Sequence, residues 1–208
     1  MSSTTTKVRT RKSPAQRTTE ILAAATLLAR EQGLSALTLR AVAERAGVAS
    51  GLIAHYHPSM DELVARVYRD LVGAEIREVE ELLADRPDAA TRMAALIGTL
   101  LDGTREDLTV VWVEAWALGR RNLPLAVAVR EQMDTWHRMV SAVIDDGCAT
   151  AVFTTPNPSD AAWQLLGMID GLNAQSLARG IEGEGYVEKM ARAAEILLGA
   201  PAASLDVR

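Results

Sequence analysis

The apolar residues of the chain recur at helical spacing almost throughout. The first run begins after Ser13-Pro14, where serine can cap the free backbone N–H groups and proline occupies the first helical position. Its apolar positions follow every three or four residues: Ile21, Ala24, Ala25 and Leu28. Gly33 ends the run, because glycine accepts the backbone angles found after helix C-termini. This pattern predicts a helix over residues 14–32.

Shorter apolar segments follow before the next long run. Thr38 is the N-cap candidate for a helix that ends before Gly47, and a third helix is predicted over about residues 50–57. Ser59 then opens a long helix through a Ser-x-x-Glu capping box. Further caps and glycines predict five more helices, at 89–102, 105–118, 124–147, 158–179 and 185–199. Strand signals are scarce and only the loop 150–158 could hold a short extended segment, so the chain is predicted to be all-α with nine helices.

The charges of the chain divide it into two parts. The 208 residues carry a net charge of −5, but residues 1–60 carry +5 and residues 61–208 carry −10. A basic N-terminal part indicates a surface that faces nucleic acid, on an acidic body that faces something else. We therefore predict a flexible basic arm at 1–12, a part that faces nucleic acid at 13–58 and an acidic helical body at 59–208.

The two short helices on either side of Gly47 have the pattern of a helix-turn-helix, whose second helix enters the major groove of DNA. In that second helix, Ile53 is the one residue expected to anchor in the core. Most of its other residues are small or can form hydrogen bonds, which permits close approach to a duplex: Ala49, Ser50, Gly51, Ala54, His55 and Tyr56. Together with the positive charge, this face predicts binding of double-stranded DNA.

The stretch QRTTEILAAATLLAREQGLSALTLRAVAERAGVASGLIAHYHPSMDELV, residues 16–64, resembles the DNA-binding domain of the TetR family of bacterial transcriptional regulators. Within that family, GVASGLIAHYH is most similar to the choline-responsive BetI type, and a weaker resemblance continues through WVEAWA (112–117) and LLGMIDGLNAQSLARG (165–180). The resemblance implies a homodimeric repressor that leaves a palindromic operator when a small molecule binds. It also implies which residues contact DNA: Arg17, Thr38 and Tyr56 at phosphates, and Ala49, Ser50, Gly51, Ala54 and His55 in the groove.

The chain departs from the family pattern at three positions. Ala49 stands where the family has Ser, so the third helix must be capped by Ser50 or be weaker by about 1 kcal/mol. His57 stands where the family has Phe, and we expect a structural histidine with its hydrogen bonds satisfied. Met60 stands where the family has Lys, which removes one expected phosphate contact. The arm carries compensating cations: Arg9, Arg11 and Lys12.

Two roles are expected for the helical body. A dyad that pairs two DNA-binding domains requires a dimer interface, and the last two helices offer small and apolar residues for it: Leu166, Gly167, Gly171, Ala174, Leu177, Ala178, Ala191, Ala194 and Leu198. The same residues would also suit an ordinary intramolecular core. The second role is effector binding, for which the candidates are mixed aromatic and polar side chains: Trp112, Trp116, Met133, Trp136, His137, Met168, Asp170 and Asn173. Tryptophan faces attract cationic or quaternary amines, although tryptophans in helical proteins are mostly core residues.

Catalytic motifs are missing from the chain. No HExxH, GxSxG, GxGxxG or P-loop occurs, and one cysteine and three histidines do not make a metal site, so we expect no enzyme, no cofactor and no metal. No apolar run is long enough for a membrane span and no signal peptide is recognisable, which predicts a cytoplasmic protein. Two alternatives fit parts of the pattern: a non-specific architectural DNA-binding protein, and a helical ligand-binding protein with no DNA role.

Overall fold

The computed structural model describes residues 13–179 and 185–207, and the predicted basic arm at 1–12 lies outside them. Within these ranges the chain forms nine α-helices and one 3-10 helix, with no strand. The helices are α1 (Pro14–Gln32), η1 (Leu34–Ala36), α2 (Leu39–Ala46), α3 (Ser50–Tyr56), α4 (Met60–Ala84), α5 (Ala89–Leu101), α6 (Glu106–Gly119), α7 (Leu123–Ala149), α8 (Pro158–Arg179) and α9 (Tyr186–Leu198). The all-α, nine-helix prediction is therefore confirmed.

The helices begin where the local sequence predicts, because their caps are local hydrogen bonds. Ser13 Oγ accepts from the backbone N–H of Gln16 at 3.2 Å, and the Gln16 side chain accepts from the N–H of Ser13 at 2.9 Å. The side chains of Thr38 and Ser59 accept in the same way at the starts of α2 and α4. The short helix η1, between α1 and α2, was not predicted, because three residues carry no period.

Gly147 does not end α7 as predicted, since the helix continues to Ala149. A Cβ built on Gly147 would lie 2.0 Å from Cδ2 of Phe153, whose ring is 1% exposed. This glycine therefore allows the loop after α7 to fold back against the helix. The loop 150–158 contains no strand, although the N–H of Thr154 donates to the carbonyl of Leu198 at 2.8 Å.

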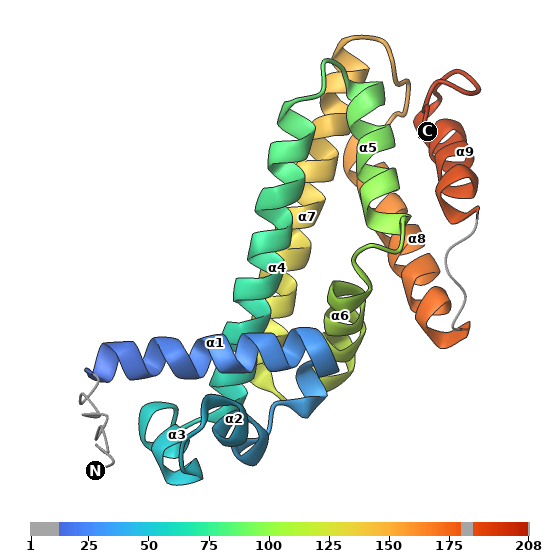
Figure 1. Cartoon of the computed structure of the whole chain (residues 1–208). Helices are drawn as coiled ribbons and strands as arrows, with labels where there is room; N and C mark the ends of the chain where they lie inside the picture. The colour runs from blue at the N-terminus through green and yellow to red at the C-terminus, as the bar shows by residue number, and fades with distance from the viewer. Residues whose placement is uncertain (1–12, 180–184, 208) are drawn as a thin grey trace, which may run out of the picture.

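The molecule has two lobes joined by α4 (Figure 1). Helices α1 to α3 form the lower lobe, hereafter the head, and α4 runs from the head into the body, where it lies beside α7. Helices α5, α8 and α9 cover the far side of that pair, and α6 lies where the body meets the head. One apolar core connects both lobes, from Ile21 in α1 to Leu198 in α9. In the described ranges, no helix is both long and apolar enough to cross a membrane.

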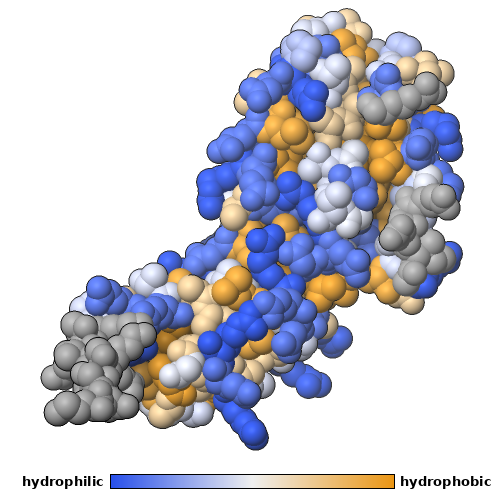
Figure 2. Space-filling model, viewed as in Figure 1, coloured by the Kyte–Doolittle hydropathy of each residue, from blue (hydrophilic) through white to orange (hydrophobic). Residues whose placement is uncertain are grey.

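The position of α9 corrects part of the predicted dimer interface. Ala191, Ala194 and Leu198 are all buried within the protomer itself, in contact with its own core. They cannot contact a second chain, so for α9 the intramolecular alternative is the right one. The exposed apolar residue of this helix is instead Ile196, which is 84% exposed. Polar side chains cover much of both lobes, with apolar areas between them (Figure 2).

Candidate functional site

The outer surface of the head is formed by α2, the turn after it and α3. Gly47 adopts the left-handed conformation, with φ 64° and ψ 39°, which turns the chain sharply between the two helices. Ile53 is fully buried and is the only buried residue of α3. The helix therefore rests on one anchor and presents its other side outward, with Gly51, Ala54 and His55 exposed.

The ends of α3 differ from what the sequence predicts. Ala49 occupies the N-cap position and no side chain caps the helix, so Ser50 does not compensate for the missing cap. At the other end, Nε2 of His57 is buried and makes no hydrogen bond to any described residue, so the expected satisfied histidine is wrong. Burial and the nearby Arg66 guanidinium lower the pKa of His57, which keeps the ring neutral at neutral pH.

The arginines of the head differ in whether they form ion pairs with neighbouring carboxylates. Arg17, a predicted phosphate contact, forms an ion pair with Glu20 at 3.0 Å. Arg45 on α2 forms a bidentate ion pair with Glu31 on α1. Arg40 is exposed on α2 and makes no ion pair within the described part of the chain, so its charge is available to a ligand. It escaped the sequence prediction, although its position two residues after the Thr38 cap puts it on the helix-turn-helix.

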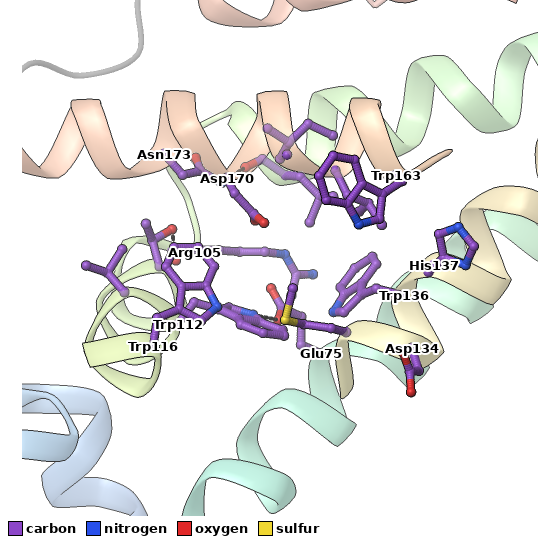
Figure 3. A pocket seen from close by; sticks show the side chains of 17 residues that line it. Glu75, Arg105, Trp112, Trp116, Asp134, Trp136, His137, Trp163, Asp170 and Asn173 are labelled. Atoms are coloured by element: carbon purple, nitrogen blue, oxygen red, sulfur yellow. Dashed lines mark hydrogen bonds between the residues drawn. The ribbon is translucent and has the colours of Figure 1, made fainter. Parts of the chain in front are cut away.

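A cavity of about 400 Å³ lies in the body between α4, α6, α7 and α8. Most of the predicted effector residues line it, from three different helices (Figure 3): Trp112, Trp116, Met133, Trp136, His137, Asp170 and Asn173. Met168 does not line the cavity and is 39% exposed. Trp163 also lines the cavity, so all four tryptophans of the chain meet there.

Two carboxyl groups approach the cavity from opposite helices, Glu75 buried and Asp170 half-buried. Glu75 of α4 is 4% exposed and its Oε2 accepts a hydrogen bond from Nε1 of Trp112 at 3.1 Å. Burial raises the pKa of Glu75, and burial raises the pKa of Asp170 on α8 to about 6. Glu75 was not predicted from the sequence. Its spacing could have indicated burial, because Glu75 lies about one turn from Val72 and from Val79, on the apolar side of α4.

The aromatic rings form a connected group beside these carboxyl groups. The Trp112 ring packs edge-on against Tyr68 with centroids 5.5 Å apart, and it lies 6.1 Å from the Trp116 ring. Arg105 reaches into the cavity in Figure 3, while its Nη1 is bound to Glu78 at 3.0 Å. Nε1 of Trp116 is buried and donates to no described residue, which leaves one donor for a ligand. Aromatic faces and carboxylates together suit a positively charged organic ligand.

Two protein-family models match the chain, one in the predicted DNA-binding region and one in the helical body. The model described as bacterial regulatory proteins, tetR family, matches residues 21–67, and the model described as BetI-type transcriptional repressor, C-terminal, matches residues 99–199. The HTH-type transcriptional regulator BetI of Stenotrophomonas maltophilia is 30% identical over 151 residues, which cover 68% of this chain and 71% of that protein. The HTH-type transcriptional repressor KstR2 of Rhodococcus jostii is 27% identical over 136 residues, covering 63% and 67%.

Solved structures share the fold over most of the chain. A transcriptional regulator from Saccharomonospora viridis, solved in complex with choline, superposes with a TM-score of 0.75 at 21% identity, covering 89% of this chain and 96% of that one. The regulator FadR of Bacillus subtilis, solved with stearoyl-CoA, gives a TM-score of 0.68 at 20% identity, covering 88% and 98%. The same fold therefore accommodates ligands of very different size and charge.

Proposed function

Because the chain belongs to the TetR family of bacterial transcriptional regulators, we propose that it is a homodimeric repressor that a small cationic molecule releases from its operator. The family consists of DNA-binding regulators and not of enzymes. The proposed domains are a basic arm at 1–12, a DNA-binding domain at 13–58 and an effector-binding and dimerisation domain at 59–208.

The exposed face of α3 is proposed to read the major groove. Small residues at Ala49, Gly51 and Ala54 allow close approach, while His55 can donate or accept a hydrogen bond at a base edge. Arg17, Thr38 and Tyr56 are proposed to hold phosphates, joined by Arg40. Ser50, the first residue of α3, is proposed to face the groove as well. One such helix reads few base pairs, so specificity requires a second copy about 34–36 Å away or at a related spacing.

The outer faces of α8 and α9 are proposed to bring two chains together. Ile196 and Met168 are exposed apolar residues on these helices. On α8 the predicted interface residues are exposed or half-buried, and they remain part of this proposal: Leu166, Gly167, Gly171, Ala174, Leu177 and Ala178. Leu166 and Gly167 also line the effector cavity, so this end of the proposed interface borders the cavity. Small residues allow the helices of two chains to approach closely, and apolar area removed from water stabilises the pair. Ile196→Glu is expected to shift the protein to monomers in sedimentation.

The pair of carboxyl groups among four tryptophans, one buried and one half-buried, is the observation that carries the proposed effector class. A cation between Glu75 and Asp170 would restore charge balance to groups whose ionisation is disfavoured by burial. Each tryptophan face adds about 0.5–2 kcal/mol through cation–π attraction. The same two acids oppose an anionic ligand such as an acyl-CoA. The choline complex of the Saccharomonospora viridis regulator supports this choice.

A titration with choline chloride tests the effector class, because every tryptophan lines the cavity. We expect saturable quenching of tryptophan fluorescence by choline and by tetramethylammonium, and none by the neutral isostere 3,3-dimethylbutanol. Equal responses to the charged and neutral compounds would reject a cation site. Capture of genomic DNA fragments by the purified protein, in competition with random duplex, tests the operator. Absence of sequence preference would favour an architectural role, and absence of salt-dependent binding would remove the DNA role.

A further inference from the structure

Helix α6 carries two opposite functional faces. Trp112 and Trp116 are one turn apart and both point into the cavity. Glu114 lies two positions from each of them, about 200° around the helix, and therefore points the other way. Asp107 is seven residues before Glu114 and shares its side of the helix. The cavity and this acidic side are thus parts of one rigid element.

The acidic side of α6 is bound to the head. Oε2 of Glu114 accepts a hydrogen bond from the backbone N–H of Ser35 at 2.9 Å, and Oε1 accepts one from the Ser35 hydroxyl at 2.6 Å. Nearer the start of α6, Oδ2 of Asp107 pairs with Nε of Arg30 at 2.7 Å. These partners lie at the end of α1 and in η1, which lead directly to the cap of α2 at Thr38. Figure 1 shows α6 against this corner of the head.

Gly33 shows that the contact with Glu114 is closely fitted. Its φ is 82°, a conformation that favours glycine, and a Cβ placed there would lie 2.4 Å from Oε2 of Glu114. The carboxylate thus occupies the space that any other side chain at this position would need. Hydrogen bonds that a backbone N–H and a hydroxyl donate to a charged carboxylate are stronger than those between two neutral groups.

We propose that Glu114 is the positioning residue that couples the effector cavity to the DNA-reading head, through its double hydrogen bond to Ser35. The head is joined to the body covalently along α4, by the shared apolar core, and by the polar contacts of α6 with Ser35 and Arg30. When a ligand repositions Trp112 and Trp116, α6 moves as a unit and carries η1 and the start of α2 with it. The proposal rests on the proposed function, but its test does not require the natural effector.

Tryptophan fluorescence provides that test, because the head contains no tryptophan and all four in the chain line the cavity. Coupling is reciprocal, so operator DNA bound at the head must alter the cavity. We expect saturating operator duplex to change the acrylamide quenching of wild-type tryptophans. Glu114→Ala is expected to bind the same duplex with that change lost. Glu114→Gln keeps one acceptor oxygen for Ser35 and is expected to recover part of it.

Glu106→Ala is the matched control, because Glu106 is an exposed acid on the same helix with no bond to the head. It is expected to behave as wild type. In a second arm, choline should weaken operator binding 5- to 150-fold in wild type and less than about 3-fold in Glu114→Ala, with choline affinity unchanged within about 2-fold. An unchanged cavity signal in operator-bound wild type, or a full signal in Glu114→Ala, would overturn the coupling role. Failure of choline to quench wild type would instead count against the proposed effector class.

Discussion

Asp170→Asn should stabilise the empty protein while removing its affinity for cations. Burial raises the pKa of Asp170 from its ordinary value of 3.8 to about 6. Each pKa unit corresponds to about 1.4 kcal/mol, so ionisation of this buried group at pH 8 costs about 3 kcal/mol. The side chain is only half-buried by surface area, and solvent reduces that figure. We therefore expect the variant to gain about 1–2 kcal/mol in free energy of unfolding at pH 8.

The sign of the pH dependence follows from the direction of the shift. Between about pH 4 and pH 6 the folded protein binds more protons at Asp170 than the unfolded chain, so this group destabilises the fold progressively as pH rises. The advantage of Asp170→Asn should therefore be largest above pH 6 and disappear toward pH 4. Choline binding by the wild type should weaken as pH falls through 6, since protonation removes the charge that attracts the cation.

The measurement is urea unfolding followed by circular dichroism at several pH values, at one fixed protein concentration because the proposed dimer would make stability depend on concentration. Asp134→Asn is the matched control, because Asp134 also lines the cavity but is exposed, and its carboxylate points away from the cavity centre in Figure 3. It is expected to change stability by less than about 0.5 kcal/mol. A variant at residue 170 that is no more stable than wild type at pH 8, or whose effect is the same at every pH, would refute the reasoning.

Other substitutions test the head and the cavity separately. His55→Ala should reduce the ratio of operator affinity to random-DNA affinity in competition binding, whereas Arg17→Ala should lower both affinities by the same factor. Equal losses of the two affinities in His55→Ala would exclude base reading. Trp116→Ala should retain operator affinity but lose release by choline, and full release would place the ligand elsewhere. Ile53→Ala removes the buried anchor of α3 and should cost about 2–5 kcal/mol in chemical unfolding, with operator binding impaired. A cost below 1 kcal/mol would show that α3 is held by other contacts.

Gly33, Gly47 and Gly199 end their helices as predicted, whereas Gly147 does not. Caps such as Ser13 and Thr38 act within three residues, so their hydrogen bonds can be inferred from neighbouring letters. Gly147 was predicted to stop α7, but it serves close packing against Phe153, six residues further along the chain. A glycine has several uses, and the distant partner decides which one applies.

The residues of the cavity also show that local sequence does not reveal distant partners. Trp112 and Trp116 were recognisable candidates because their spacing places them on one helix face. Glu75 was missed, since an acid in a long helix is ordinarily exposed, and only the indole N–H of Trp112, 37 residues away, explains its burial. Met168 shares α8 with Asp170 but does not line the cavity, which the apolar pattern of that helix does not distinguish.

The order of amino acids alone was enough for the nine α-helices, for the helix-turn-helix with its Ile53 anchor and for the positive charge of residues 1–60. These depend on hydrogen bonds and periodicity within one or two helical turns, which neighbouring residues specify. Tertiary packing decided which side of α9 faces the core, which acids meet the tryptophans, and that Glu114 reaches Ser35. Those outcomes depend on contacts between segments far apart in the chain, where the cost of burying a charge is set by groups that no local pattern contains.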